Sequence, residues 1–450
     1  MLKFKKRWVF NYKSECDLDG KGGNHMDVIK LGMIGLGTVG SGVLAMIQEH
    51  ADKIYAVTGR RLILKTVMVR DLAKHQDVAE VVHLTTDLDD ILSDPEIQIV
   101  VEVMGGIHPA KEVITQLLQA HKHVVTANKD LISTEGADLI RLARANGCDL
   151  MYEASVAGGI PILRTIADSF AADQITEVKG IVNGTTNYIL TQMAQQGWTY
   201  AAALKQAQQL GFAESDPTND VQGKDAAYKM MILSQFSFGT QVNLEDFETT
   251  GIDAVAAQDV RQATAFGYVL KLVGVARLVD QGIFVEVAPA LVSVHHPLAG
   301  VNNENNAVMV QGQAVGDTLF YGPGAGALPT ANSVLSDITT VVKNMILKTN
   351  GNSFNRYSQA LPLATPAQVK DRYYLALTLP DQPGEMQKLT TVMAQINASF
   401  SQIVQQAGEN GQARVMIITH TMSKEQLHEL QQRLTALGTI TLHCAYRVIE

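Results

Sequence analysis

The sequence predicts a multidomain α/β protein, on three observations. A glycine-rich turn joins an early apolar strand to a helical segment, further apolar strands alternate with helices, and the last 80 or so residues have a strand and helix order of βαββαβ. A chain of 450 residues is long enough for two or three hydrophobic cores. We expect an unstructured basic extension at 1–25, a Rossmann-type dinucleotide-binding domain at 26–150, an α+β substrate domain at 151–345 whose last helix returns to the first domain, a linker at 346–369, and a ferredoxin-like βαββαβ domain at 370–450.

Composition excludes several classes of protein. With 46% hydrophobic and 18% charged residues the chain is not disordered, and a net charge of −9 argues against a nucleic-acid partner. No apolar run approaches the ~18 residues of a membrane span, and the N-terminus lacks a signal-peptide core, so we expect a cytoplasmic protein without a membrane partner. The cysteines, Cys16, Cys148 and Cys444, form neither a metal-ligand pattern nor a disulfide framework.

Residues 1–25 are basic and then glycine-rich, without a helical or strand period. Met26 stands directly before the first strand, so one interpretation is that translation begins there and the preceding residues are an upstream extension.

The first element of the folded chain is an apolar strand at 28–34, followed by the turn Gly35-Leu36-Gly37-Thr38-Val39-Gly40 and a helix from about Val39 to Tyr55. Glycine is needed at position 35 for the tight bend, at 37 for close approach of a pyrophosphate, and at 40 for packing of helix on strand. Such a turn alone is weak evidence, but its place between strand and helix favours dinucleotide binding over a purely structural turn.

The second strand, 62–69, ends in Arg70-Asp71. An acidic residue here selects a free ribose hydroxyl, and a basic one accepts a 2′-phosphate. Because Arg70 comes first and Lys74 is close, we expect NADP, with NAD tolerated. The separation from Gly35 exceeds the usual ~20 residues, which we attribute to a long first helix and a loop at 58–61.

Later strands also end in residues suited to a ligand, because the carboxyl ends of parallel strands carry the site. The strand at 97–104 ends at Gly105-Gly106, and the strand from His123 ends at Thr126-Ala127-Asn128-Lys129. We expect Thr126, Asn128 and Lys129 to point towards the cofactor, although a lysine after a strand is commonly a surface cation. The stretch from Leu150 to Pro161 is predicted to be a strand that ends in small residues, whose carbonyls beside Glu153 suit a cation.

The stretch 211–233 runs from a carboxylate-rich loop into a helix, with an expected cap near Asp220. Asp225 and Lys229 lie one turn apart on that helix. An exposed ion pair is the simpler interpretation. Small and apolar neighbours, together with Glu214 and Asp216 in the loop, favour instead a pocket that takes a small cationic group.

Residues 316–327 form a glycine-dense segment, interpreted as a loop that either connects or closes over the cofactor. After the linker we expect strands at 372–379, 399–406, 413–420 and 439–448, with helices at 385–396 and 423–436. The turn Asp381-Gln382-Pro383-Gly384 offers free N–H groups to a small ligand, and the sheet edge can pair with another copy.

From about residue 28 to 450 the chain resembles the homoserine dehydrogenases that carry a C-terminal ACT regulatory domain. The resemblance rests on the motifs at 35–40, 101–106, 126–129, 153–161, 182–188, 211–229 and 321–326. It implies reduction of L-aspartate 4-semialdehyde to L-homoserine with NAD(P)H, on the route to threonine, isoleucine and methionine. It also implies a catalytic and dimerisation role for 151–345, a regulatory role for 370–450 and threonine as an effector. A homodimer or homotetramer is the default expectation.

The resemblance also implies roles for single residues. Lys129 and Lys229 would flank the reacting oxygen, with Lys229 as proton donor and Asp225 beside it; Glu214, Gly211, Asp220 and Asp225 would hold substrate. Gly35, Leu36, Gly37, Thr38, Val39, Gly40, Arg70, Gly105, Thr126, Lys129 and Gly322 would contact the cofactor. Glu153 and the carbonyls of Val156, Gly158 and Ile160 would bind sodium. Asn219 departs from the aspartate of some members, so we give it no catalytic role.

Two other functions fit parts of the sequence. An acylating semialdehyde dehydrogenase would need a nucleophilic cysteine, and Cys148 lies outside any glycine turn or histidine pairing. A nucleotide-sensing regulator without enzymatic activity would bind cofactor tightly without turnover.

Overall fold

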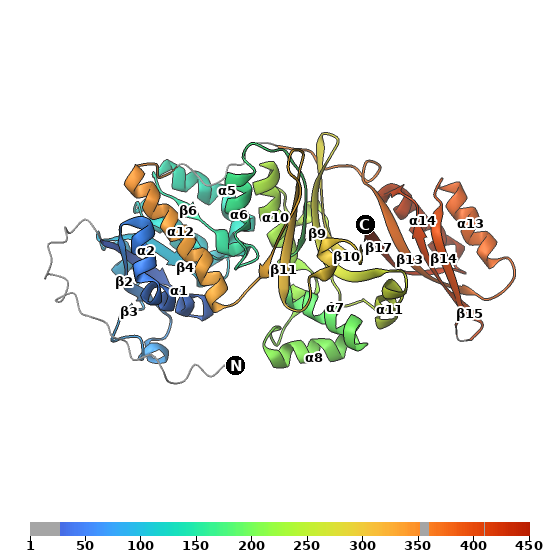
Figure 1. The fold of residues 1–450 in the computed structure, drawn as a ribbon, viewed down its shortest axis with the longest axis horizontal. Coiled ribbons are helices and arrows are strands. Elements are labelled where there is room, and N and C mark those ends of the chain that lie inside the picture. The colour runs from blue at the N-terminus through green and yellow to red at the C-terminus, as the bar shows by residue number, and fades with distance from the viewer. Residues whose placement is uncertain (1–27, 352–359, 409) are drawn as a thin grey trace. The chain divides into compact units, whose positions relative to one another are not determined.

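A computed structural model describes residues 28–351, 360–408 and 410–450 (Figure 1). Within these residues the chain forms two compact units, one from residues 28–172, 231–243 and 322–351, the other from 173–230, 244–321, 360–408 and 410–450. The basic extension, Met26, Cys16 and part of the expected linker lie outside the described residues. The five-part division expected from sequence stays a prediction, and residues 360–450 share one compact unit with 173–230 and 244–321.

The first unit is built on a parallel sheet of six strands in the order β3-β2-β1-β4-β5-β6. The strands are β1 (Val28–Ile34), β2 (Arg61–Met68), β3 (His83–Thr85), β4 (Ile97–Glu102), β5 (His123–Thr126) and β6 (Leu150–Met151). The order reverses between β1 and β4, which is where a doubly wound sheet binds its ligand. The predicted Rossmann-type α/β fold is confirmed.

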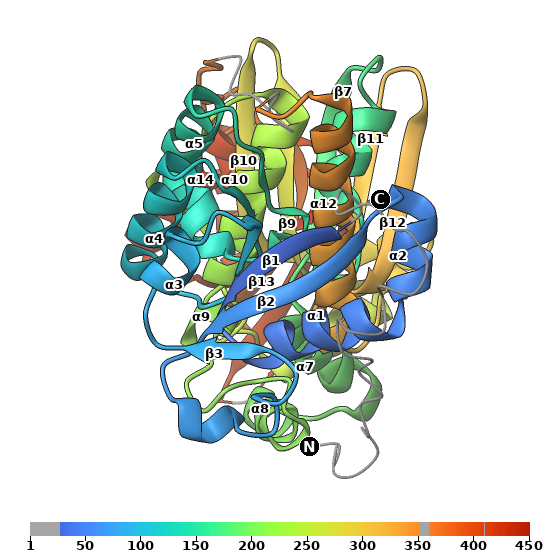
Figure 2. The same ribbon diagram turned by 90° about the vertical axis from the view of Figure 1, so that its left-hand side faces the viewer.

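Helices cover both faces of this sheet: Figure 2 shows α1 and α12 on one side and α4 and α5 on the other. The helices are α1 (Thr38–Glu49), α2 (Ala51–Thr58), α3 (Asp89–Leu92), α4 (His108–Gln119), α5 (Lys129–Ala145), α6 (Ile162–Arg164) and α12 (Ala327–Leu347). The backbones of α1 and α12 approach closely, since a Cβ at Gly42 would overlap the carbonyl oxygen of Ala327. Residues from 331 to 342 of α12 share the core of this unit.

The single first helix predicted from Val39 to Tyr55 is wrong. The helix ends at Glu49 and a second one begins at Ala51, because His50 between them has φ −111° and ψ 19°, outside the helical region. The second helix ends at Gly59, which is left-handed with φ 67°.

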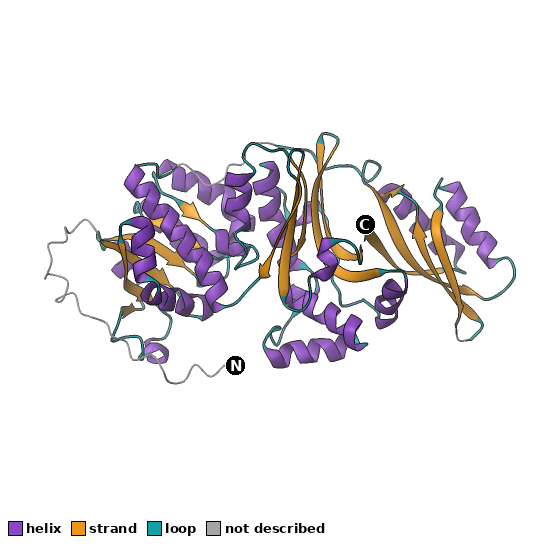
Figure 3. Ribbon diagram, viewed as in Figure 1, coloured by secondary structure: helices purple, strands orange, loops and turns teal. Residues whose placement is uncertain are grey.

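The second unit is built on a mixed sheet of eleven strands (Figure 3), in the order β12-β11-β7-β9-β10-β17-β13-β15-β14 with β8 and β16 off this path. The strands are β7 (Ile175–Ile181), β8 (Glu248–Thr249), β9 (Tyr268–Val279), β10 (Gly282–Ser293), β11 (Asn305–Gly312), β12 (Gly316–Pro323), β13 (Lys370–Pro380), β14 (Phe400–Ala407), β15 (Gln412–Thr419), β16 (Met422–Ser423) and β17 (Thr441–Ile449). The 316–327 segment is therefore mostly strand, not loop, because β12 pairs with β11.

The C-terminal segment has the predicted βαββαβ order, with α13 (Glu385–Gln395) and α14 (Lys424–Leu437) between its strands. Its last strand, β17, pairs in parallel with β10 through residues 447–449. The sheet of the C-terminal segment thus continues the sheet formed by residues 173–323. Part of the expected linker is also fixed, since the Pro362 carbonyl accepts from the Ile283 amide at 2.8 Å.

The other helices of this unit are α7 (Gly184–Gln196), α8 (Tyr200–Leu210), α9 (Thr218–Val221) and α11 (Ala257–Ala265), and α10 (Lys224–Phe238) begins in it. Asp220 was expected to cap the helix that carries Lys229. It lies instead within α9, so that expectation is wrong. Gly223, with φ 81°, separates α9 from α10. In the described part of the chain no helix is long and apolar enough to cross a membrane.

Candidate active site

The glycine turn after β1 leaves open space at the start of α1. Gly35 has φ 100°, and a Cβ there would lie 2.7 Å from the carbonyl oxygen of Val103. A Cβ at Gly40 would overlap the carbonyl oxygen of Gly35, so both glycines are required by backbone packing. Gly37 is exposed and has nothing within 4 Å of a Cβ, and no side chain caps α1. A diphosphate fits such a helix start.

The other residues of the turn divide between core and surface. The side chain of Leu36 is 7% exposed and belongs to the core, and Val39 packs partly against it. Leu36 therefore offers a cofactor only its backbone, whereas Val39 keeps part of its side chain accessible. Thr38 is exposed as the first residue of α1.

The acidic and basic residues after β2 differ in what they contact. The Asp71 carboxylate accepts from the Ala73 amide at 3.0 Å, which caps a short 3₁₀ helix, and it lies 3.6 Å from the Lys74 ammonium. Arg70 is exposed. The charged group at the end of β2 that remains available to a cofactor is therefore basic.

Glu102, at the end of β4, is fully buried. It accepts from the Thr126 hydroxyl at 2.6 Å and from the Met104 amide at 2.7 Å, and burial raises its pKa. The Thr126 hydroxyl is thus bonded inside the protein, between Glu102 and the Asn128 amide, and the expected contact of Thr126 with a cofactor stays a prediction. Gly105 and Gly106 follow with φ 74° and 78° and open space around them.

Lys129 is the first residue of α5 and directly follows the N-cap residue Asn128. The side-chain oxygen of Asn128 accepts from the Leu131 amide at 3.2 Å. The Asn128 amide also donates to the Gly106 carbonyl at 2.7 Å, which joins the ends of β4 and β5. A cation at a helix N-terminus is opposed by the helix dipole. The Lys129 side chain is 31% exposed, and its ammonium lies 3.6 Å from the Asp130 carboxylate. Helix stability therefore gives no reason for a lysine at this place.

The segment expected to bind a cation is buried. Glu153 accepts from the amides of Leu163 and Arg164 at 2.8 and 2.7 Å, and burial raises its pKa. The Gly158 carbonyl accepts from the Ser333 hydroxyl at 2.6 Å, and the Ile160 carbonyl from the Ile162 amide at 2.8 Å. The carbonyl of Val156 completes the expected ligand set.

Two features shape this segment. Ala157 is buried with φ 48°, a left-handed conformation that is uncommon without glycine. A Cβ at Gly158 would lie 2.8 Å from the Gly324 carbonyl oxygen, so the segment packs directly on the loop that follows Gly322. Among the described residues, no three His, Cys, Asp or Glu side chains are grouped as a metal site. A cation here would rely on backbone carbonyls.

The second unit brings Asp225 and Lys229 together as predicted. The Lys229 ammonium donates to the Asp225 carboxylate at 2.7 Å and to the Val182 carbonyl at 2.6 Å. Their side chains are only 12% and 11% exposed. The simpler interpretation as a surface ion pair is therefore wrong.

Asp220 lies in the same group and contacts Asn183 and Thr185, two residues that the sequence predicted only as part of the 182–188 motif. The Asn183 amide donates to Asp220 at 2.7 Å and to Asp225 at 2.8 Å. The Thr185 hydroxyl lies 2.6 Å from the Phe212 carbonyl and 3.2 Å from Asp220. Burial raises the pKa of Asp220, and the charge of Asp225 adds to this. An asparagine directly before a helix is typical of an N-cap, as Asn183 is for α7, but this local pattern does not predict the contacts with Asp220 and Asp225.

Other candidate residues lie nearer the surface. Glu214 and Asn219 are exposed, and Gln208 donates to the backbone carbonyl of Glu214 at 3.1 Å. Gly211 ends α8 in a left-handed conformation with φ 79° and open space beside it. Burial raises the pKa of the Cys148 thiol to about 11, which removes the nucleophile that an acylating enzyme would need.

The fold and these residues define an NAD(P)-dependent oxidoreductase that acts on a CH–OH group. The family model of the homoserine dehydrogenase NAD-binding domain matches residues 35–153, and that of homoserine dehydrogenase matches 161–339. The chain is 44% identical to the homoserine dehydrogenase of Bacillus subtilis, over 94% of this chain and 99% of that protein. It is 43% identical to the Lactococcus lactis enzyme, over 90% and 96% of the two chains.

A solved homoserine dehydrogenase from Thiobacillus denitrificans superposes with a TM-score of 0.89 at 36% identity, over 94% of this chain and 98% of that one. A hyperthermophilic archaeal homoserine dehydrogenase in complex with NADPH has a TM-score of 0.60 at 27% identity, over 71% and 98%. The chain belongs to the homoserine dehydrogenase family.

Proposed function

We propose that the chain reduces L-aspartate 4-semialdehyde to L-homoserine with NADPH, and that Lys229 is the proton donor. Hydride addition to the aldehyde carbon leaves a negative charge on the carbonyl oxygen. A positioned ammonium stabilises that charge and supplies the proton, which the solvent then replaces. The observation that carries the proposal is the Lys229 ammonium, mostly buried and fixed between Asp225 and the Val182 carbonyl.

The carboxylates suit the rest of the substrate. An amino-acid substrate brings its own ammonium group, and Glu214, Asp220 and Asp225 offer negative charge to it, with Gly211 adjacent. Lys129, by likeness to the family, acts on the reacting oxygen. Its place at a helix N-terminus, where a cation gains no helix stabilisation, supports a functional role.

The preferred cofactor is NADP, with NAD tolerated. Arg70 is exposed at the end of β2, whereas the neighbouring Asp71 is occupied as a helix cap. The archaeal relative in complex with NADPH gives further support.

A sodium ion is proposed at the carbonyls of Val156, Gly158 and Ile160 beside Glu153. The groups fit, because a carboxylate or carbonyl oxygen that accepts one hydrogen bond keeps a lone pair for a cation. The ion would fix this buried segment, and no step of the reaction depends on it.

The C-terminal βαββαβ segment is proposed as an ACT domain that binds threonine in a homodimer or homotetramer. The helix α13 starts after Gly384 without a side-chain cap, so its N–H groups suit a carboxylate. β12 and β14 are the edge strands of the sheet order, which leaves edges for pairing between copies.

The test is an assay of NADPH oxidation with L-aspartate 4-semialdehyde. We expect the wild type to turn over, and Lys229→Ala to lose about 10²-fold or more in kcat while NADPH binding is retained. Lys224→Ala is the matched control, because Lys224 is an exposed lysine on the same helix. Near wild-type kcat in Lys229→Ala would overturn the assignment of the proton donor.

A further inference from the structure

We infer that Asn183 is a positioning residue whose side-chain amide joins Asp220 and Asp225 and sets the orientation of both carboxylates and, through Asp225, of Lys229. The inference rests on the proposed function and assigns a task to a residue that never touches the reacting atoms.

The orientation of the Asn183 amide is fixed by its partners. Its carbonyl oxygen accepts from the Thr186 amide at 2.8 Å and caps α7. Its nitrogen faces carboxylate oxygens of Asp220 and Asp225, at 2.7 and 2.8 Å. Only one assignment of oxygen and nitrogen satisfies both sides, since a carboxylate accepts and a backbone N–H donates. Both hydrogens of the NH₂ group are therefore used on the carboxylates.

Capping alone does not explain an asparagine here. Serine or aspartate caps a helix about as well, because a cap needs only an oxygen acceptor. The NH₂ group adds something that these residues lack, namely two donors aimed at two acidic side chains. Asn183 is 5% exposed, so water does not readily replace those donors.

The negative charges of Asp220 and Asp225 explain what the Asn183 NH₂ group does. Burial, and then the charge of Asp225, raise the pKa of Asp220, which opposes ionisation of the pair. A donor shared by the two carboxylates favours their charged forms. Asp225 Oδ2 accepts from both Asn183 and Lys229, and Lys229 also donates to the carbonyl of Val182, which directly precedes Asn183. A shift of Asn183 therefore moves both acceptors of the Lys229 ammonium, the Asp225 carboxylate and the Val182 carbonyl.

Two substitutions separate capping from positioning. Asn183→Asp keeps the cap oxygen and the shape but replaces the donors with a third carboxylate. We expect a KM for L-aspartate 4-semialdehyde about tenfold higher, the scale of a lost hydrogen bond to a charged group. We also expect the acid limb of kcat/KM to move up by about one pH unit, since the carboxylate pKa rises. Asn183→Ser keeps the cap without added charge, and should raise KM with a smaller pH shift.

The control is Thr199→Ala, which removes the cap of α8 and leaves the carboxylate group intact. It should lower the melting temperature without changing the pH profile. If Asn183→Asp has the wild-type KM and pH profile, or if both Asn183 variants change only the melting temperature, the positioning role is overturned.

A readout without turnover keeps the two proposals separate. The titration of Asp220 can be followed by carbon NMR of aspartate-labelled protein in the wild type and in Asn183→Asp. A raised pKa in the variant supports the positioning role, and an unchanged pKa overturns it. If the wild type does not oxidise NADPH with the semialdehyde, the proposed function fails, whatever this titration gives.

Discussion

Two buried lysines of the second unit use their charge differently. Lys229 is paired with a carboxylate, for which a cationic substrate group can compete. Lys271 is 2% exposed and donates to neutral oxygens, the Val301 carbonyl at 2.5 Å and the side chains of Asn187 and Asn302 at 3.1 and 3.3 Å. Burial lowers the pKa of Lys271 to about 8. Lys271 thus holds the 301–302 turn against α7, a structural task.

At the same scale, helical spacing was enough to predict the Asp225–Lys229 pair. It was not enough for Glu102, Asn183 or Thr185. Asn183 meets Asp220 and Asp225 across 37 and 42 residues of chain, and Glu102 meets Thr126 across 24. Contacts that depend on how distant elements pack leave no local pattern.

Arg70 is the residue on which we expect cofactor choice to depend. Arg70→Ala should raise the KM for NADPH by about tenfold or more, since a charge-assisted bond to the 2′-phosphate is lost, and leave the KM for NADH almost unchanged. Lys74→Ala is the control, a nearby lysine already placed beside Asp71. An equal loss for both cofactors would mean that Arg70 contacts something other than the 2′-phosphate.

At the scale of elements, the strands and most helices followed from apolar periodicity and glycine turns. The predictions were wrong where contacts with distant parts of the chain, or a single left-handed residue, decide the local structure. β12 is strand because β11 lies beside it, despite its glycines, and α9 is separate from α10 because Gly223 is left-handed. No local signal in the sequence marks the break at His50.

The segment from Glu153 to Ile160 provides the element-scale prediction. Ala157 is left-handed, and burial raises the pKa of Glu153 although Arg164 lies near it, so a sodium ion beside Glu153 should stabilise the segment. We expect NaCl to raise the melting temperature of the wild type by a few degrees over choline chloride at equal ionic strength. Glu153→Gln should lose this difference, because a neutral amide is a weaker cation ligand. Glu135→Gln, which changes an acid outside the segment, should keep it.

Two results would contradict the sodium site. One is a wild type that melts at the same temperature in both salts. The other is a Glu153→Gln variant with an undiminished response to sodium, even though its own melting temperature falls.

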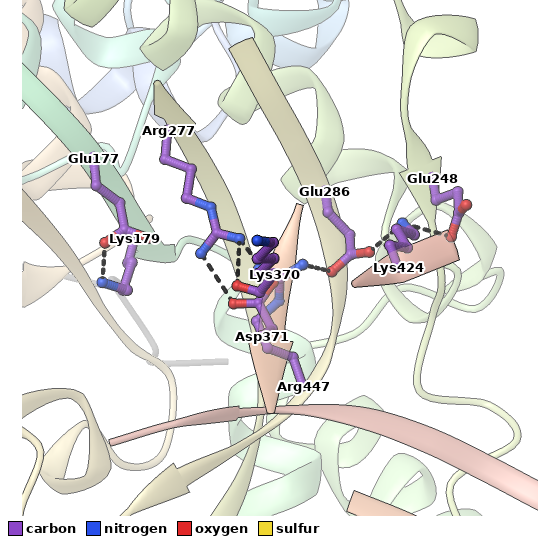
Figure 4. A network of polar contacts seen from close by, with 9 residues as sticks. All are labelled: Glu177, Lys179, Glu248, Arg277, Glu286, Lys370, Asp371, Lys424 and Arg447. Atoms are coloured by element: carbon purple, nitrogen blue, oxygen red, sulfur yellow. Dashed lines mark hydrogen bonds and ion pairs between the residues drawn. The ribbon is translucent and has the colours of Figure 1, made fainter. Parts of the chain in front are cut away.

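At the scale of the whole second unit, buried charges join the C-terminal segment to the sheet of residues 173–323 (Figure 4). Glu286 on β10 accepts from Lys424 at 2.7 Å and from Arg447 at 2.6 Å. Asp371 pairs with Arg447 at 2.8 Å and with Arg277 on β9 at 2.7 Å. Burial opposes these charges, but Arg447 and Lys424 hold the pKa of Glu286 below its usual value.

This network changes how threonine regulation should be tested. A chain cut near residue 345 would lose β17 from the edge of β10 and leave Glu286 without Lys424 and Arg447. Removing one side of a buried ion pair costs roughly 3–5 kcal/mol, so loss of regulation in such a chain would not be distinguishable from partial unfolding. A substitution of Lys424 in the full chain keeps β17 in place and leaves Glu286 paired with Arg447, and the melting temperature measures the stability that is lost.

We therefore predict that threonine inhibits the full chain and that Lys424→Met weakens this inhibition by about threefold or more while threonine still binds. An effector acts only through a difference in affinity between two states, and the link from α14 to Glu286 is a path by which the C-terminal segment can bias the sheet beside it. Arg433→Met is the control, because its side chain is 41% exposed and its partners Glu429 and Gln395 lie on α14 and α13, within the C-terminal segment. Calorimetry gives threonine binding, initial rates give inhibition, and light scattering gives the oligomer. A full-length protein that binds no threonine ends the regulatory proposal, and one that binds it without inhibition leaves the segment as an assembly element alone.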